Sequence, residues 1–128
     1  MNEGARRTAI AAMIVALCCS AGACAPAGSP ADRFAKDPEA VKRGKGIFTG
    51  TCGAYCHSNK SDNRDAPYLF DCEWLHGGSD EQIHATIANG VPGTRMVGFG
   101  GKMPQGDDDI WRLVAYLKTH REACANPD

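Results

Sequence analysis

The feature that most constrains this chain is a pair of cysteines followed directly by a histidine, in the stretch Cys52-Gly53-Ala54-Tyr55-Cys56-His57. Two thiols beside an imidazole are typical of a covalent haem attachment site. Each thiol can add across one vinyl group of the porphyrin, and His57 is then held beneath the iron as an axial ligand. Such sites usually have two residues between the cysteines, whereas this chain has three. We therefore expect the extra residue to be absorbed as a bulge between Cys52 and Cys56.

Three other chemistries fit the same residues. Closely spaced cysteines can form a reactive redox dithiol. They can also bind zinc, with His57 as a third ligand and a distant residue as the fourth. In an exported protein, Cys52 and Cys56 can simply form a structural disulfide. The motif favours haem and leaves these alternatives open.

Residues 1–23 are predicted to be a signal peptide. Arg6 and Arg7 give a positive start, and the uncharged apolar run after them is shorter than the ~20 residues that a spanning helix needs. Ala21-Gly22-Ala23 offers a small-residue cleavage site and would leave Cys24 at the new N-terminus. Lipid attachment to Cys24, and with it membrane anchoring, is the alternative to ordinary cleavage. Export implies a periplasmic protein, and haem attachment in bacteria occurs on that side of the membrane.

The expected mature domain contains four cysteines, two in the haem motif and two outside it. Of seven in the chain, Cys18, Cys19 and Cys24 lie in the leader region. We predict that Cys72 and Cys124 form a disulfide in an oxidising compartment. The alternative is that both are small buried thiols. The formal net charge of -1 gives no reason to expect nucleic acid as a partner.

Residues 24–36 are rich in Ala, Pro, Gly and Ser and are predicted to be a flexible linker. The folded domain is expected to span residues 37–128. Asp37 is a good helix N-cap, and Pro38 suits the first helical position. Gly44 lowers helix stability by ~1 kcal/mol relative to Ala, so we interpret it as a point where another backbone approaches.

Three further helices are predicted. Asp71–His76 are expected to form a short helix ended by glycines, with Trp74 as a core residue whose N–H needs a partner if it is buried. Ser79 and Gln82 make a capping-box pattern, which predicts a helix over residues 80–89. The aspartates Asp107–Asp109 are expected to cap the last helix and to complement its dipole. The apolar residues after them have helical spacing and predict a buried stripe: Ile110, Leu113, Val114 and Leu117.

Haem binding would also need a partner for His57 and a second axial ligand. A metal-bound histidine usually donates its other ring N–H to a carbonyl or carboxylate, and Pro67 is a candidate because it has a carbonyl and no N–H. Met96 and Met103 lie in the glycine-rich stretch 91–105, and their sulfurs are soft donors that iron accepts. Each residue also has an ordinary interpretation, as a loop proline or as a methionine that fills a core.

In this order, the motifs resemble those of class I c-type cytochromes over residues 37–121. The stretch 44–48 resembles the first helix of that family, 93–97 resembles the stretch with the axial methionine, and 113–118 resembles the closing helix. The resemblance implies an all-α, cytochrome c-like fold with three to five helices around one covalently bound haem. It also implies that Gly44 lies beneath an aromatic side chain of the closing helix.

The resemblance implies a site as well. Haem c would be attached to Cys52 and Cys56, with His57 and Met96 as axial ligands and Met103 as the alternative to Met96. With both axial positions filled, the iron would gain and lose one electron without binding a substrate. The implied function is that of a monomeric periplasmic electron carrier, not an enzyme, between a dehydrogenase and a respiratory acceptor.

A weaker resemblance, over residues 70–78, is to small cytochromes associated with quinoprotein alcohol dehydrogenases. Such a dehydrogenase and a terminal oxidase are therefore expected to dock at the haem edge. Four basic residues expected near that edge can steer an acidic partner or can simply be solvated: Lys60, Arg64, Arg95 and Lys102.

Two rival functions stay open. One is a peroxidase or gas-binding sensor with an open iron position, and the other is a disulfide-stabilised or zinc-binding interaction domain without haem.

Overall fold

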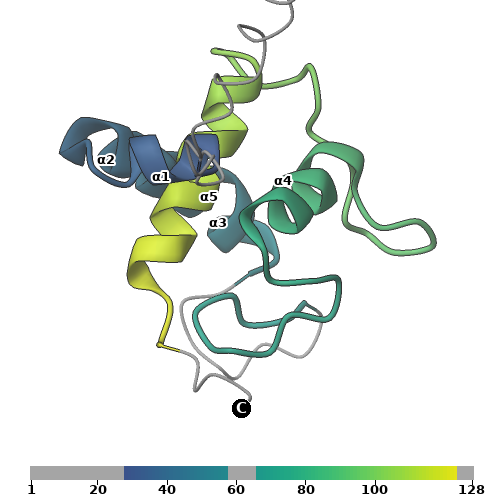
Figure 1. Cartoon of the computed structure of the whole chain (residues 1–128). Coiled ribbons are helices and arrows are strands. Elements are labelled where there is room, and N and C mark those ends of the chain that lie inside the picture. The colour runs from purple at the N-terminus through teal and green to yellow at the C-terminus, as the bar shows by residue number, and fades with distance from the viewer. Residues whose placement is uncertain (1–27, 58–65, 124–128) are drawn as a thin grey trace, which may run out of the picture.

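The computed structural model describes residues 28–57 and 66–123, and that part of the chain is all-α (Figure 1). The fold class predicted from the sequence is confirmed. The predicted signal peptide and Cys124 lie outside the described residues. None of the described helices is both long enough and apolar enough to cross a membrane.

A short helix, α1 (Pro30–Phe34), lies in the segment that the sequence predicted to be a flexible linker. Ala31 and Phe34 are buried in the core, and the Lys118 ammonium of the last helix donates a 2.6 Å hydrogen bond to the Asp32 carboxylate. The linker prediction is therefore wrong for this helix. Its order comes from an aromatic anchor and an ion pair to a distant helix, and local composition does not report either of them.

The next helices begin where the sequence placed them. α2 (Pro38–Ile47) starts after Asp37, whose carboxylate accepts a hydrogen bond from an amide of the first turn at 3.0 Å. α4 (Asp80–Asn89) starts with a complete capping box: Ser79 Oγ accepts from the Gln82 amide, and Gln82 Oε1 accepts from the Ser79 amide. These bonds satisfy amides that a helix start leaves without internal partners.

The short helix predicted for Asp71–His76 is absent, and this stretch consists of turns and bends. The Asp71 carboxylate accepts a hydrogen bond from the Glu73 amide at 3.0 Å, and the Gly77 amide donates to the Trp74 carbonyl at 3.3 Å. Such local bonds offer the backbone an alternative to a helix, which is why that prediction was wrong.

α2 crosses α5 (Asp107–His120), and this is the most extensive contact between described elements. In Figure 1, α1 and α2 lie on one side of α5, and α4 with the loop after it lies on the other. At the crossing, Gly44 lies so close to the Arg112 carbonyl that a methyl group there would overlap it, and Tyr116 Cβ would be only 2.9 Å away. The close approach predicted for Gly44 is confirmed. The predicted stripe on α5 is buried: Ile110, Leu113, Val114 and Leu117.

Aromatic rings fill the core beside this crossing. Phe48 is fully buried, with its ring centroid 5.1 Å from that of Phe70 and 5.7 Å from that of Tyr116. The Phe70 and Tyr116 rings lie 5.8 Å apart in an edge-to-face arrangement. Edge-to-face pairs add to the stabilisation from area burial. The cluster therefore joins the end of α2 to α5 and to the segment before α4.

The loop after α4 folds back onto the C-terminal end of that helix. The Phe99 and Gly100 amides donate to the carbonyls of Ile87 and Ala88, each at 2.9 Å. Within the loop, the Val91 amide donates to the carbonyl of Met96 at 2.9 Å. These bonds fix the part of the loop that carries Met96 relative to α4.

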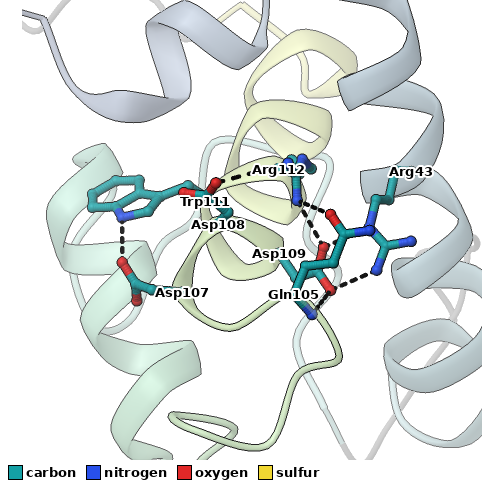
Figure 2. Close-up of polar contacts among 7 residues, drawn as sticks. All are labelled: Arg43, Gln105, Asp107, Asp108, Asp109, Trp111 and Arg112. Carbon is teal, nitrogen blue, oxygen red and sulfur yellow. Dashed lines mark hydrogen bonds and ion pairs between the residues drawn. The ribbon is translucent and has the colours of Figure 1, made fainter.

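The other end of this loop is held by a buried carboxylate, Asp109. Arg43 of α2 donates to it at 2.6 and 2.7 Å, and the Gln105 amide and Arg112 each donate at 3.0 Å (Figure 2). The sequence predicted that Asp109 would help to cap the last helix, but the N-cap is Gly106, and Asp109 is 0% exposed. Hydrogen bonds from Arg43, supported by Gln105 and Arg112, lower the pKa of Asp109 to about 2 against the opposing effect of burial.

The glycine at the helix crossing gives a matched pair of substitutions. We expect Gly44→Ala to destabilise the haem-loaded protein by roughly 3 kcal/mol, because the new methyl meets backbone that cannot move without separating the helices. Gly46→Ala adds the same methyl two residues further along α2, where nothing lies within 4 Å, and should be neutral or stabilising by up to ~1 kcal/mol. Urea unfolding of both variants measures the difference. Equal stabilities would show that the helices do not meet at Gly44.

The buried carboxylate predicts how acid affects stability. A lowered pKa means that ionised Asp109 stabilises the fold fully above its ordinary pKa of 3.8, and that this stabilisation is lost as the pH falls towards 2. The shift corresponds to about 2 kcal/mol. We expect Asp109→Asn to cost roughly 3 kcal/mol at pH 7, because two guanidinium groups then face a neutral amide.

Asp108→Asn is the matched control, since the Asp108 side chain is 56% exposed and lies 3.8 Å from Arg112. It should change stability by less than ~0.5 kcal/mol. Unfolding of the haem-loaded protein between pH 5 and pH 2 should show a weaker pH dependence in Asp109→Asn than in the parent. The same pH dependence in both proteins would contradict the assignment to Asp109.

Candidate haem site

The two motif cysteines lie on a helical segment that continues directly from α2. A π-helical turn, η1 (Phe48–Cys52), is followed by the short α3 (Gly53–Tyr55). The Cys56 amide donates to the Cys52 carbonyl at 3.1 Å, and the His57 amide donates to the same oxygen at 2.8 Å. A widened helical turn therefore absorbs the extra residue, and this is the form that the expected bulge takes.

His57 is oriented at the end of this segment by a hydrogen bond from its ring. The ring is buried, with 8% of the residue exposed, and Nδ1 lies 2.8 Å from the Pro67 carbonyl oxygen. Because a carbonyl can only accept, Nδ1 carries the proton and Nε2 presents its lone pair. This is the tautomer of a histidine that binds a metal through Nε2. The contact between His57 and Pro67 that the sequence suggested is present.

The surroundings of Cys52 and Cys56 bear on the three alternatives to haem, which are a redox dithiol, a disulfide and a zinc site. Burial, with a smaller effect of the neighbouring Cys56, raises the pKa of the Cys52 thiol to about 11. Reactive redox dithiols have the opposite property, a lowered pKa, so the environment does not favour a dithiol redox centre. Neither sulfur forms a disulfide in the structure. Within residues 28–57 and 66–123, no three His, Cys, Asp or Glu side chains are grouped to hold a metal ion, so that part of the chain gives zinc no support.

Two observations test whether haem fits these residues. Trp74 Nε1–H is buried and has no hydrogen-bond partner within the described residues. A buried indole N–H normally finds an acceptor, and the propionates of a haem are strong ones. The core is also bordered by large hydrophobic side chains that the polypeptide covers only in part: Tyr68, Leu69, Trp74, Met96 and Phe99. An apolar macrocycle with acceptor groups at one edge fits both features.

Trp74 is the residue whose importance the sequence did not reveal. The sequence predicted a core position for its indole, with a partner for the N–H if it is buried. The structure supplies the missing fact, since the N–H is buried and has no acceptor in the part of the chain that the structure describes. No sequence pattern reports this, because it depends on which groups the fold brings together.

The two candidate methionines lie in different parts of the loop after α4. Met96 is half-buried against the core, its amide donates to Thr94 Oγ1 at 3.1 Å, and its neighbour Val97 forms a β-bridge with Gly90. Met103 is also half-buried against the core, and it lines a groove beside α2 together with Ile47 and Thr51. The structure therefore gives the two sulfurs different surroundings, and only that of Met96 is tied to α4.

Cys72 is disulfide-bonded, and Cys124 lies outside the described residues. The Cys72 sulfur is 3.7 Å from the carbonyl oxygen of Glu122, and the Glu122 amide donates to the Phe70 carbonyl at 2.9 Å. The chain end that leads to Cys124 therefore runs beside Cys72. The predicted pairing of these two cysteines stays a prediction.

Comparison with known proteins identifies the family. Residues 39–117 match the model of the family described as cytochrome c oxidase, cbb3-type, subunit III. The chain is 40% identical over 65 residues to the cbb3-type cytochrome c oxidase subunit CcoP of Rubrivivax gelatinosus, which covers 50% of this chain and 21% of that protein. It is 31% identical over 97 residues to subunit FixP of Sinorhizobium medicae, which covers 69% of this chain and 32% of that protein. The chain thus spans about a fifth to a third of the length of these relatives.

Solved structures show the same fold. Cytochrome cL from Methylophaga aminisulfidivorans superposes with a TM-score of 0.60 at 22% identity, over 69% of this chain and 57% of that one. Cytochrome cL from Hyphomicrobium denitrificans gives 0.59 at 22% identity, over 73% and 52%. Together with the family match and the fit of the site, these likenesses lead to one conclusion. The chain belongs to the cbb3-type cytochrome c oxidase subunit III family, and is a small class I cytochrome domain that binds haem c covalently and transfers electrons.

Proposed function

We propose that this chain is a periplasmic single-haem electron carrier that takes electrons from a dehydrogenase and passes them to a respiratory acceptor. The haem is attached through Cys52 and Cys56, with His57 and Met96 as its axial ligands. The bound haem supplies one-electron chemistry, in which the iron alternates between two oxidation states. The chain itself holds the two axial side chains in place and shields them from water.

The observation that carries this proposal is the state of His57. The ring is buried, its Nδ1–H is engaged by the Pro67 carbonyl, and Nε2 forms no hydrogen bond within the described residues. The residue follows directly after a thiol that can anchor the porphyrin. A hydrogen bond at Nδ1 fixes the orientation of the ring and raises the basicity of Nε2 towards a metal.

Met96 is the better second ligand on the available contacts. The backbone around it is fixed on both sides, by the bridge between Gly90 and Val97 and by the bond from the Val91 amide. Both methionine side chains pack against the core, and that of Met103 also lines the groove beside α2 with Ile47 and Thr51. An axial thioether must keep one position in both oxidation states, and a fixed backbone supports this.

We propose that redox partners dock beside the two axial residues. Tyr55, next to Cys56, is 81% exposed, and Val97, next to Met96, is 58% exposed. Arg95 and Lys102 are exposed on the same loop as Val97 and can steer an acidic partner, while the two other basic residues, Lys60 and Arg64, lie outside the described residues. Interfaces of redox partners are small, below ~1,200 Å², so a few exposed apolar side chains suffice.

The electron acceptor and the electron donor are supported by different observations. A terminal oxidase as acceptor is supported by the relatives, which are subunits of cbb3-type oxidases. A quinoprotein alcohol dehydrogenase as donor is supported only by the weaker resemblance of residues 70–78.

We further propose that the carrier is monomeric, does not bind nucleic acid, and contacts the membrane only if Cys24 is lipidated. The Cys72–Cys124 disulfide closes the C-terminal end of the domain.

Mass measurement tests haem attachment. When the chain is expressed with a cytochrome maturation system, we expect its intact mass to exceed that of the polypeptide by one haem. We expect haem staining on a denaturing gel to agree. Replacing both Cys52 and Cys56 by Ala should abolish both signals, while the exposed Tyr55→Ala control should keep them.

Alkylation of the same sample under denaturing conditions without reductant should leave Cys72 and Cys124 unmodified.

A colourless product of polypeptide mass would end the haem proposal, and alkylated Cys72 or Cys124 would end the disulfide proposal. Binding of carbon monoxide to the reduced protein at neutral pH would favour the peroxidase or sensor alternative, because it requires an open iron position. A carrier should also exchange electrons with cbb3-type oxidase membranes, more slowly as ionic strength rises.

The choice of methionine has its own spectroscopic test. We expect Met96→Ala to remove the weak far-red band that reports sulfur bound to ferric iron, because Met96 lies on the loop tied to α4. Met103→Ala, the matched control on the same loop, should keep the band. Loss of the band in Met103→Ala and its retention in Met96→Ala would reverse the assignment.

A further inference from the structure

The thiol motif contains one residue more than usual, and the backbone shows where that residue goes. Two hydrogen bonds in this segment join residues five apart: the Gly53 amide donates to the Phe48 carbonyl, and the His57 amide donates to the Cys52 carbonyl at 2.8 Å. Bonds between residues five apart define a π-helical turn, which is rare and is frequently found at functional sites. The first widened turn therefore leads into the motif, and the second spans it from Cys52 to His57.

The second of these bonds has a direct geometric meaning. With two residues between the cysteines, an ordinary α-helical bond would join the histidine amide to the carbonyl of the first cysteine. With three residues, the π-type bond from His57 to Cys52 joins the same two groups. The amide that orients the imidazole therefore keeps its partner, although the chain between them is one residue longer.

Gly53 allows the backbone of the thiol motif to pass close to the buried Phe48 ring. A Cβ atom at this position would lie 3.0 Å from Cε1 of Phe48, closer than side chains normally pack. Phe48 has no room to yield, because it is fully buried between Phe70 and Tyr116. The two other spacer residues, Ala54 and Tyr55, are exposed and meet no such limit.

We propose that Gly53 and the π-helical turn are positioning elements for haem attachment. They allow the spacer to run along the buried Phe48 ring while Cys52, Cys56 and His57 keep the placement that two thioethers and one axial bond require. The inference rests on the proposed attachment of haem to these cysteines. It adds that the extra residue is a tolerated insertion whose accommodation depends on the absence of a side chain at Gly53.

The first experiment compares two glycines of the same segment. Gly53→Ala and Gly50→Ala are expressed with a cytochrome maturation system, and intact mass and the pyridine haemochrome spectrum count the thioethers. Gly50→Ala should match the parent, because nothing lies within 4 Å of its added methyl. Gly53→Ala should give roughly tenfold less of the product with two thioethers, since the methyl displaces the turn from Phe48. Equal yields of that product would overturn the proposal.

A second variant separates positioning from simple loss of stability. Phe48→Leu removes the ring atom that the new methyl would meet. Combined with Gly53→Ala, it should restore the two-thioether fraction to that of Phe48→Leu alone. If the two substitutions instead reduce the yield independently, Gly53 does not act through its contact with Phe48, and the proposal fails.

The spacer length gives the last test. A chain that lacks Ala54 should keep both thioethers and the far-red band, because the π-type bond to His57 then becomes an ordinary α-helical one. A chain with a second alanine after Ala54 should lose one thioether, since the turn absorbs one residue only. A single thioether, or no haem, in the shortened chain would contradict the inference. A parent chain without haem would instead show that the proposed function itself is wrong.

Discussion

The backbone contact between Gly44 of α2 and the Arg112 carbonyl of α5 determines where the proposed haem-binding residues lie. It brings two helices together without intervening side chains, so their relative position is set by hard contact. α2 runs directly into η1 and the thiol motif, and the fixed crossing therefore fixes Cys52 and His57 as well. Phe48 transmits the constraint, since it packs on Tyr116 one helical turn beyond the crossing.

Buried and half-buried charges hold the remaining elements to this pair of helices. Asp109 of α5 binds α2 through Arg43 and the loop after α4 through the Gln105 amide. Lys118 of α5 donates to Asp32 at 2.6 Å and to Asp80 at 2.7 Å. Compared with well-packed apolar groups in the same places, such pairs add little net stability, because desolvation of the charges offsets much of their attraction. They do penalise alternative arrangements, since any shift leaves a buried charge without a partner. In a domain whose loops contain many glycines, that specificity helps to define one position for Met96.

The range of each interaction explains how much of the fold could be predicted from the sequence. The helix starts at Asp37 and Ser79 depend on residues within one turn, and both were predicted correctly. The approach at Gly44 was predictable because a glycine within a helix calls for an explanation. The helix at Pro30–Phe34 and the burial of Asp109 were missed, because each depends on a partner more than 60 residues away.

In the site, too, local features could be predicted from the sequence and features that depend on distant residues could not. The His57–Pro67 contact could be anticipated, because ligand chemistry demands an acceptor nearby. The buried Trp74 N–H, which has no acceptor among the described residues, could not, because it becomes visible only when the fold is in place. In the proposed site, haem gives both groups a partner, so that binding of the cofactor and completion of the core would be one process. The same fold occurs at 22% identity in cytochrome cL. A framework completed by a cofactor would need few fixed side chains, and exposed residues beside the proposed axial ligands, such as Val97, could then diverge to suit different partners.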